Sequence, residues 1–371
     1  MTRSRLRHGY TTGACAAAAA RGAAVMLREQ RIVDTVDLTL PGGELVEFPL
    51  HGQVLTDTFA SCYVVKDAGD DPDVTHGVEV HARIDAEFFA PHRVVLRGGE
   101  GIGRATKPGL AVPVGEWAIN PVPRRMIQEG VREVLAMRCM PCTLTVTISI
   151  PDGAERAKKT LNERLGIVGG LSILGTTGIV KPISAQAWTD TIDTAIDVAL
   201  ASRTGTVVLS TGRTSELVVQ GEFGLKAPGA GRGEKPEISS LSEESFVMMG
   251  DYVGHALRSC LRKGVKRVVM AGQFAKLLKI ACGHEQTHVG SSELDLRMLH
   301  DWLAADPATA RLAPLAERAN TARQVLEESE RDPALVALVC GRAKAFAATV
   351  APGLELKVLL AGYGGEVLYF G

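Results

Sequence analysis

Two clusters of acidic and histidine side chains could carry chemistry in this 371-residue chain. In the first, four aspartates lie within seven residues, Asp67, Asp70, Asp71 and Asp73, and His76 follows them. Carboxylates can face a cation, and an imidazole can transfer protons. A calcium loop needs oxygen ligands at alternating positions and a glycine at the sixth, which this spacing does not supply. Two interpretations stay open: a solvated turn built on Asp-Asp-Pro-Asp, or a site that faces a cationic ligand.

The second cluster is the segment His284-Glu285-Gln286-Thr287-His288, which has the H-E-x-x-H spacing of zinc peptidases. In those enzymes both histidines lie on one face of a helix and bind zinc, and the glutamate acts as general base. Glycines directly before and shortly after the segment disfavour a continuous helix. The sequence therefore argues against zinc, and a zinc-dependent hydrolase that uses His284, Glu285 and His288 stays as an alternative.

A glycine-rich stretch at 161–184 could form a binding surface. Glycine allows a positive φ and lets a ligand approach the backbone closely. No Gly-Lys-Ser/Thr closes the stretch, so it is not a nucleotide phosphate loop. We predict a glycine-lined wall that carries hydroxyl groups, with tight turns in a buried region as the plainer alternative. The residues concerned are Gly166, Gly169, Gly170, Gly175, Gly178, Thr176 and Thr177.

A second glycine-rich segment, 99–103, follows an expected strand. Its spacing differs by one residue from the dinucleotide-binding pattern, and 104–108 would begin a helix poorly, so NAD is not expected. Arginine forms paired hydrogen bonds with carboxylates, so the basic residues near this segment could meet an acidic substrate. They are Arg97, Arg104, Lys107, Arg124 and Arg125.

Five stretches taken together resemble a known family. They are LNERLGIVGGLSILGTTGIVKPIS at 161–184, GYTTGACAAAAA from Gly9, KDAGDDPDVTHG from Lys66, GEGIGRATKPGL from Gly99 and AINPVPRRMI from Ala118. In this order they look like the motifs of the CbiD family of cobalt-precorrin-5B C(1)-methyltransferases of anaerobic cobalamin synthesis. The resemblance runs from residue 9 to about 184 and more weakly to the end of the chain.

Residues 271–295 resemble a further segment of that family. Lys276, Lys279, Thr287 and His288 match it, whereas other family positions differ. The family has His, Gly and Asn where this chain has Gln273, Ala275 and Gln286. These departures argue against a catalytic use of the segment, and they leave open whether the substrate differs from that of the family.

The resemblance implies an enzyme that moves a methyl group from S-adenosyl-L-methionine to carbon 1 of cobalt-precorrin-5B. The products would be cobalt-precorrin-6A and S-adenosylhomocysteine. The cobalt would arrive with the corrinoid substrate, so no metal bound by the protein itself is expected. A non-catalytic tetrapyrrole-binding protein is a second alternative.

On this resemblance, charge assigns the motifs to the two reactants. Four aspartates would repel a macrocycle with several carboxylates, but they suit a sulfonium cation with an amino group and ribose hydroxyls. We therefore expect the methyl donor to contact Asp67, Asp70, Asp71, Asp73, Gly169, Gly170, Thr176 and Thr177. The macrocycle is expected to contact Thr11, Thr12, Arg97, Arg104, Lys107, Asn120, Arg124 and Lys276. His76 and His288 are the candidates for general acid–base catalysis.

Composition bounds the remaining functions. The chain is 46% hydrophobic and 22% charged, with a net charge of −1, which is typical of globular proteins and gives no basic field for nucleic acid. Seven scattered cysteines suit a reducing compartment, and the isolated C-x-x-C at Cys139 and Cys142 is expected to be structural. We expect no apolar stretch to reach the ~18 residues of a membrane span. We expect a cytoplasmic protein with a small-molecule substrate and no membrane partner; a homo-oligomer is compatible with the sequence.

The expected elements fall into two domains. Residues 1–184 are predicted to form an α+β domain that begins with an alanine-rich helix. Thr11 or Thr12 is expected to cap this helix, whose first turn would face outward and which would end near Glu29. Strands are expected at 33–40, 45–50, 62–66, 78–84, 94–97 and 144–150, and helices at 124–137 and 154–165. Residues 185–371 alternate strands and helices, which predicts a doubly wound, Rossmann-like α/β domain with a mobile insert at 222–240.

Overall fold

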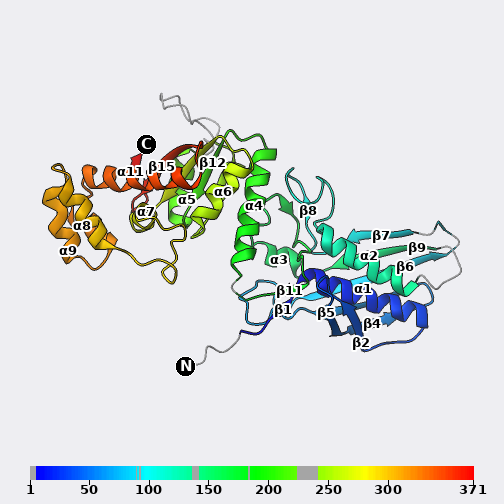
Figure 1. The fold of residues 1–371 in the computed structure, drawn as a ribbon. Helices are drawn as coiled ribbons and strands as arrows, with labels where there is room; N and C mark the ends of the chain where they lie inside the picture. Colours follow the sequence, from blue (N-terminus) through cyan, green and yellow to red (C-terminus); the bar gives the residue numbers. More distant parts are fainter. Residues whose placement is uncertain (1–5, 89, 92, 136–141, 183, 224–240) are drawn as a thin grey trace. The chain divides into compact units, whose positions relative to one another are not determined.

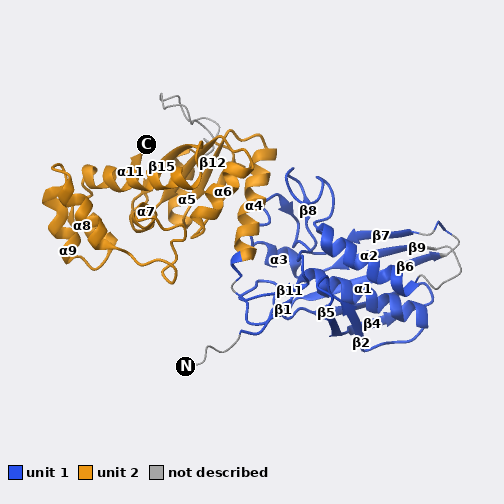
Figure 2. Cartoon of the chain, viewed as in Figure 1, with its two compact units in different colours: residues 1–185 blue, residues 186–371 orange. Residues whose placement is uncertain are grey.

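The structure is a computed structural model that describes residues 6–88, 90–91, 93–135, 142–182, 184–223 and 241–371. The chain divides into two compact units, residues 1–185 and 186–371 (Figure 2). Each unit has a hydrophobic core of its own. The insert expected at 222–240 falls almost entirely outside the described residues, and so does Cys139. The α+β and Rossmann-like classifications stay predictions.

A five-stranded sheet forms the centre of the first unit. Its order is β4 (His51–Leu55), β5 (Phe59–Val65), β6 (Glu79–Phe88), β9 (Cys142–Ser149) and β7 (Arg93–Gly98) (Figure 1). Neighbouring strands are antiparallel except β7 and β9, which run parallel. Because side chains alternate along a strand, one face of the sheet is apolar. That face contributes Ala60, Cys62, Val64, Val80, Ala82, Ile84, Leu144, Val146 and Ile148 to the core.

Helices α1 (Thr12–Glu29) and α2 (Pro121–Leu135) pack with the apolar face of this sheet (Figure 1). Helix α1 contacts both the sheet and α2, so even its residues Ala14–Ala20 are buried. Alanine suits this position because it favours the helix while its small side chain lets the neighbouring elements approach closely. The predicted cap is confirmed, since the Thr11 side chain accepts a hydrogen bond from the backbone N–H of Ala14 at 3.2 Å.

Short paired strands complete the first unit. The strands predicted at 33–40 and 45–50 are confirmed as β2 (Thr35–Thr39) and β3 (Leu45–Pro49), which pair antiparallel as a hairpin. Strand β8 (Arg104–Ala105) pairs with β10 (Ile167–Val168). Strand β8 directly follows the glycine-rich segment 99–103, and β10 belongs to the glycine-rich stretch 161–184. The two glycine-rich parts of the sequence therefore lie side by side.

Glycines allow three backbone segments to meet where these stretches join. A Cβ atom added to Gly101 would lie 1.8 Å from the carbonyl oxygen of Ile150, and one added to Gly153 or Gly170 would lie 2.3 or 2.2 Å from that of Gly101. The backbone N–H of Leu171 donates to the same Gly101 carbonyl at 2.9 Å. We call Gly101, Gly153 and Gly170 the glycine junction. This packing accounts for a glycine at position 170, and its predicted contact with a methyl donor stays a prediction.

The helix expected at 154–165 is much shorter, because α3 covers only Gly153–Ala157. The hydroxyl of Thr160 donates to the carbonyl of Ala157 at 2.7 Å, and its backbone N–H donates to the same oxygen at 2.9 Å. The threonine thereby takes the acceptor that a continuing helix would need. Residues after Thr160 turn back toward the glycine junction, where the Asn162 amide donates to the carbonyl of Gly170 at 3.2 Å.

The second unit is also built on a five-stranded sheet. Its order is β13 (Phe246–Met248), β12 (Thr206–Ser210), β14 (Arg267–Gly272), β15 (Glu355–Ala361) and β16 (Val367–Phe370). The first four strands are parallel, and β16 is antiparallel to β15. One face packs on α5 (Arg213–Phe223), and the other on α4 (Ala185–Ala201), α6 (Val253–Arg262), α7 (Phe274–Ala281) and α11 (Pro333–Val350). Because both faces of the sheet are covered, all five residues of β12 are buried, and its central residues Val207–Leu209 are apolar.

Three helices connect α7 to α11. They are α8 (Leu296–Ala305), α9 (Ala313–Arg318) and α10 (Ala322–Glu328). Helix α11 is long and apolar enough to cross a membrane by length and composition, which corrects the expectation that no stretch reaches that length. Its buried residues belong to the core of the second unit, and core helices of globular proteins often meet the same criterion.

Replacing Gly101 with alanine should destabilise the first unit strongly. The new methyl group would overlap the carbonyl of Ile150, and the φ of +70° at this position is unfavourable for alanine. We expect the free energy of unfolding to fall by about 3 kcal/mol or more, measured by urea denaturation. Gly42→Ala is the matched control, because a Cβ there meets no atom within 4 Å. Equal denaturation midpoints for the two variants would contradict the packing role of the glycine junction.

Candidate functional site

The N-terminal segment 7–13 lies between the two motifs that the sequence assigns to the methyl donor. On one side lies the segment 67–76 with the four aspartates and His76, which we call the aspartate loop. The backbone N–H of Tyr10 donates to the carbonyl of Asp67 in this loop at 2.7 Å. On the other side, β1 (Gly9–Tyr10) pairs with β11 (Ile179–Val180) at the end of the glycine-rich stretch. The structure thus brings the aspartate loop and the glycine-rich stretch to opposite sides of one segment, although the two motifs are about 100 residues apart in sequence.

Arg7 compensates the charge of two predicted donor ligands. Its guanidinium forms an ion pair with Asp67, with Nη2 at 3.0 Å from Oδ1, and its backbone N–H donates to Asp70 Oδ2 at 2.6 Å. The hydrogen bond and the charge of the arginine hold the pKa of Asp67 below its ordinary value. Because the protein itself supplies a cation here, the charge argument for a sulfonium at this loop loses force. The donor contacts of Asp67, Asp70 and Asp71 stay predictions.

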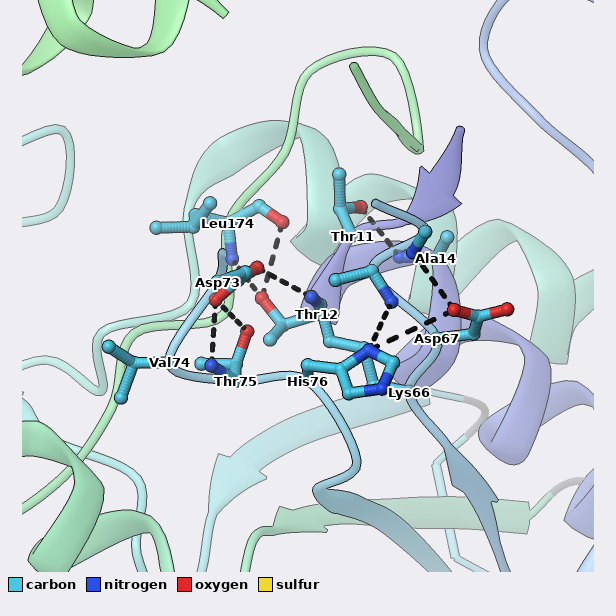
Figure 3. A network of polar contacts seen from close by, with 12 residues as sticks. Thr11, Thr12, Ala14, Lys66, Asp67, Asp73, Val74, Thr75, His76 and Leu174 are labelled. Carbon is cyan, nitrogen blue, oxygen red and sulfur yellow. Dashed lines mark hydrogen bonds and ion pairs between the residues drawn. The ribbon is translucent and has the colours of Figure 1, made fainter. Parts of the chain in front are cut away.

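An ion pair with a buried lysine, Lys66, holds the aspartate loop in place. The side chain of Lys66 is only 1% exposed, and its Nζ lies 2.6 Å from Asp73 Oδ2 (Figure 3). The backbone N–H and the hydroxyl of Thr75 donate to the other carboxylate oxygen at 2.7 and 2.6 Å. Burial raises the pKa of Asp73, but the ammonium and these hydrogen bonds outweigh it, so the pKa lies below the ordinary value. Asp73 therefore has a structural role, and its predicted contact with the donor stays a prediction.

His76 stands at the open side of the loop, with its side chain 55% exposed. Its Nδ1 accepts a hydrogen bond from the backbone N–H of Ala68 at 3.1 Å and lies 3.8 Å from Asp67 Oδ1 (Figure 3). An acceptor at Nδ1 fixes the neutral tautomer that carries its proton on Nε2. In that form the ring can donate a hydrogen bond outward through Nε2.

The first turn of α1 is covered, which corrects the expectation that it faces outward. Thr11 and Thr12 are 6% and 3% exposed. The Thr12 hydroxyl accepts a hydrogen bond from the backbone N–H of Leu174 at 3.0 Å, and the N–H of Gly13 donates to the carbonyl of the same leucine at 3.0 Å (Figure 3). Both threonines thus join the helix to the glycine-rich stretch. This use of their hydroxyls leaves them poorly placed for the predicted contact with a substrate.

Part of the glycine-rich stretch lies at the surface. Gly169, Thr176 and Thr177 are exposed, together with the apolar side chain of Leu174. A Cβ added to Gly169 would meet no atom within 4 Å, so its backbone is open to a ligand. The hydroxyl of Thr177 accepts a hydrogen bond from the backbone N–H of Ile179 at 3.2 Å. The predicted donor contacts of Gly169, Thr176 and Thr177 remain compatible with this placement.

Two of the predicted basic residues flank one short segment, 115–117. The Cζ atom of Arg104 lies 3.8 Å from the centroid of the Trp117 ring, and its Nη1 donates to the carbonyl of Gly115 at 2.6 Å. Nη2 of Arg124 lies 3.5 Å from Oε2 of Glu116. We call Arg104, Arg124 and Trp117 the basic cluster. Its arginines are held by an aromatic face and by backbone or surface partners, so carboxylates of a ligand could still bind them.

The other basic and polar residues predicted for the substrate lie apart from one another. Arg97 alternates in β7 with core residues, which places it on the polar face of the sheet, away from α1 and α2. Lys107 Nζ donates to the carbonyl of Arg164 at 3.1 Å. The carbonyl of Asn120 accepts from Arg124 N at 2.9 Å and so begins α2. Arg97 is therefore separated from the basic cluster by the sheet.

The H-E-x-x-H segment is not helical, because α7 ends at Ala281 and the next helix begins at Leu296. Glu285 forms an ion pair with Arg258, whose hydrogen bonds lower the pKa of the carboxyl group. The two histidines therefore do not share a helical face, and the zinc hydrolase alternative loses the geometry that it requires. Within the part of the chain that the structure describes, no three His, Cys, Asp or Glu side chains are grouped to hold a metal ion.

Two lysines of α7 instead hold this segment in place. Lys276 forms an ion pair with Asp251 and donates to the carbonyl of Thr287 at 3.2 Å. Lys279 donates to the same carbonyl at 3.1 Å and to that of Ser292 at 2.9 Å, and burial lowers its pKa. His288 lies in the same segment and accepts a hydrogen bond from Gly290 N at Nδ1, at 3.1 Å. The macrocycle contact of Lys276 and the acid–base role of His288 stay predictions.

Sequence reasoning did not single out Arg7, Lys66 or Asp251. Lys66 stands at the start of the aspartate motif, and a lysine that follows a buried strand directly was the available signal. Arg7 belongs to an arginine-rich start of the chain that reads as a solvated terminus. Asp251 follows a strand of only three residues, β13, which the sequence analysis did not detect.

Comparisons with known proteins agree along the whole chain. A family model described as CbiD matches residues 1–182, and one described as the C-terminal domain of CbiD matches residues 286–370. The cobalt-precorrin-5B C(1)-methyltransferases of Geotalea daltonii and Geobacter sulfurreducens are 63% and 64% identical over 375 residues, covering 100% of both chains in each pair. That of Priestia megaterium is 42% identical over 86% of this chain and 83% of its own.

One solved structure is also similar. The crystal structure of a cobalamin biosynthesis protein, cbiD, from Archaeoglobus fulgidus is 29% identical and covers 74% of this chain and 79% of its own, with a TM-score of 0.38.

Substituting Lys66 by methionine should destabilise the protein in a pH-dependent way. The folded-state pKa of Asp73 lies below its ordinary 3.8, so the ion pair stabilises the fold fully above about pH 4 and loses this effect as the pH falls further. Without the ammonium, burial would raise the pKa of Asp73 instead. We expect a loss of about 3 kcal/mol near pH 7 that shrinks below pH 4, measured by urea denaturation across pH. Lys158→Met, at an exposed ion pair, is the control. A loss that is equal at pH 3 and pH 7 would contradict this role of Lys66.

Proposed function

Because the chain belongs to the CbiD family, we propose that it methylates carbon 1 of cobalt-precorrin-5B in the synthesis of the corrin ring of cobalamin. S-adenosyl-L-methionine is the proposed methyl donor, and cobalt-precorrin-6A and S-adenosylhomocysteine are the products. The observation that carries the proposal is the 63–64% identity, over the full length of both chains, to relatives named for this activity.

The proposed reaction makes modest demands on side-chain chemistry. When bound, the donor supplies a methyl group that its sulfonium already activates, and the methyl carbon bonds to ring carbon 1 as its bond to sulfur breaks. The task of the protein is to hold ring carbon 1 at ~3–3.5 Å from the methyl carbon and in line with the bond from that carbon to sulfur. This positioning by itself lowers the barrier substantially. The thioether leaves neutral, so the reaction needs no acid at the leaving group. His76 is therefore better suited to donate a hydrogen bond from Nε2 than to protonate a product.

The basic cluster suits the acidic macrocycle. Arg104 and Arg124 each contact the segment 115–117 with a guanidinium group, and Trp117 adds an apolar ring there. A flat corrinoid with carboxylate side chains needs both kinds of surface. The glycine-rich stretch is joined to the cluster through Asn120, whose backbone N–H donates to the carbonyl of Ile173 at 3.0 Å. The exposed residues of the stretch, such as Thr176, are thereby fixed with respect to the cluster.

The aspartate loop fits the donor less well than its composition suggests. Three of its carboxylates, those of Asp67, Asp70 and Asp73, already bind Arg7 or Lys66. The donor cation would have to compete with these internal cations. A cytoplasmic location and the absence of nucleic-acid and membrane partners belong to the same proposal, and so does a homo-oligomer as a compatible state.

Incubation of the purified full chain with cobalt-precorrin-5B and donor labelled with carbon-13 in the methyl group tests the proposal. We expect one labelled methyl group per macrocycle, located at carbon 1 by nuclear magnetic resonance, and an equal amount of S-adenosylhomocysteine. A non-catalytic carrier would bind the pigment and leave the label on the donor. That result, obtained with folded protein, would refute the proposed activity.

Replacing Arg124 with glutamine should weaken substrate binding specifically. A charge-assisted hydrogen bond to a carboxylate is lost, so we expect KM for the macrocycle to rise about tenfold while kcat and KM for the donor change little. Steady-state kinetics at saturating donor measure the effect. Arg132→Gln is the matched control, because it removes an exposed arginine from the same helix. If both variants behave alike, the basic cluster does not bind the macrocycle.

A further inference from the structure

The strand order of the sheet in the second unit reverses at β12. The chain forms β12 first, then β13 on one side of it, and then β14 and β15 on the other side. Helix α5 follows β12 on one face of the sheet, and α6 follows β13 on the opposite face. In open parallel sheets, ligands bind outside the carboxyl ends of the strands at the point where the order reverses. In this unit that point is where β12, β13 and β14 end.

A glycine stands at each of these three strand ends. Gly212 follows β12, Gly250 follows β13, and Gly272 is the last residue of β14. A Cβ added to Gly212 would meet no atom within 4 Å, so the backbone of this turn is open. The backbone N–H of Thr211 donates to the carbonyl of Ala271 at 2.9 Å, which ties the turn after β12 to the end of β14. We call these strand ends, with the turns that follow them, the carboxyl edge.

An aromatic side chain is fixed at the carboxyl edge. The indole N–H of Trp188 donates to the carbonyl of Met249, directly after β13, at 3.2 Å. The ring stacks on Tyr252, with the centroids 6.5 Å apart and the planes at 29°. Trp188 is nevertheless 45% exposed. A half-exposed indole whose orientation is fixed by its own N–H can stack a planar heterocycle at little cost in side-chain entropy.

A carboxylate with spare acceptor capacity belongs to the same turn after β13, between Met249 and Tyr252, the two residues that contact the indole. Oδ1 of Asp251 accepts a hydrogen bond from the Thr287 hydroxyl at 2.6 Å and binds Lys276, whereas no described residue donates a hydrogen bond to Oδ2. Burial raises the pKa of Asp251, but these two partners lower it overall, so the group is ionised at neutral pH. In dinucleotide-binding sheets an acidic residue downstream of the first glycine turn hydrogen-bonds ribose hydroxyls. Asp251 follows the second strand of this sheet and offers that chemistry.

A buried hydroxyl at the end of β12 also lacks a partner. Ser210 is fully buried, and its Oγ forms no hydrogen bond with any described residue. A buried polar atom of this kind costs free energy unless a ligand or a water satisfies it. It is the second feature of the carboxyl edge, besides the open oxygen of Asp251, that requires a polar partner.

We propose that the adenosine half of the methyl donor binds at the carboxyl edge of the second unit. Its adenine stacks on Trp188, its ribose hydroxyls bind Oδ2 of Asp251, and its amino-acid tail runs along the open turn at Thr211 and Gly212. This inference rests on the proposed function for the identity of the ligand. It transfers the donor from the aspartate loop, where Arg7 and Lys66 form ion pairs with Asp67 and Asp73, to Asp251, which binds Lys276 through Oδ1 and leaves Oδ2 open to a ribose hydroxyl.

Calorimetric titration of the full chain with S-adenosylhomocysteine tests the site. We expect Asp251→Asn and Trp188→Ala each to weaken binding about tenfold or more, and Trp188→Phe to retain most of it, because phenylalanine still stacks. Asp301→Asn, on an exposed carboxylate of the same unit, is the matched control and should bind like wild type. Asp71→Asn tests the aspartate loop as the rival site. Thermal denaturation checks that each variant is folded. If Asp251→Asn is unfolded, the binding measured for Trp188→Ala decides whether the ligand binds at the carboxyl edge.

The outcomes separate the site from the function. Weaker binding in the Asp251 and Trp188 variants, with Asp71→Asn unchanged, supports the carboxyl edge. Binding that survives both substitutions overturns it, whether or not Asp71→Asn loses affinity, and leaves the methyltransferase activity standing. A wild-type chain that binds no S-adenosylhomocysteine and transfers no methyl group overturns the proposed function and the site together.

Discussion

The buried ion pair between Lys66 and Asp73 is the interaction on which the aspartate loop and the segments that contact it depend. Lys66 holds Asp73, which with Thr75 shapes the aspartate loop, and the loop in turn binds the N-terminal segment through Tyr10. That segment leads into the cap of α1 and pairs with the last strand of the glycine-rich stretch. A charge this deeply buried is tolerated only with a carboxylate beside it, so Lys66 and Asp73 must be kept together. The most conspicuous acidic motif of the sequence is thus largely a structural element.

Much of the fold follows from periodic patterns in the sequence. Alternation places β2, β3 and four strands of the central sheet, β5, β6, β7 and β9, within a few residues of their observed bounds, and the alanine run places α1. The patterns fail where one polar group changes the outcome. Thr160 ends α3 early by bonding a carbonyl that the helix needed. Strand β4 was missed because it is irregular, with a shift of register between His51 and Val54.

The candidate site was less accessible to sequence reasoning, because charge alone does not reveal internal partners. Arg7 and Lys66 reach the aspartates from outside the loop, so the acidic run reads as an open cation site when it is already compensated. The H-E-x-x-H segment misleads in the opposite way: its spacing suggests a metal, whereas the fold uses Thr287 within it to fix Asp251. What the sequence does show is the glycine at each strand end of the second unit. Those residues acquire meaning only once the strand order is known.

The pairing of β1 with β11 has a consequence for how the protein is made. These strands join residues 9–10 to residues 179–180, and the glycine junction joins Gly101 to Gly170. Contacts so distant in sequence close large loops and form late. On the ribosome, the alanine-rich helix must therefore wait, without its final neighbours, until about 180 residues have been synthesised and have left the exit tunnel. Until then, the start of α1 lacks the cover that residues 174–180 give it in the finished fold.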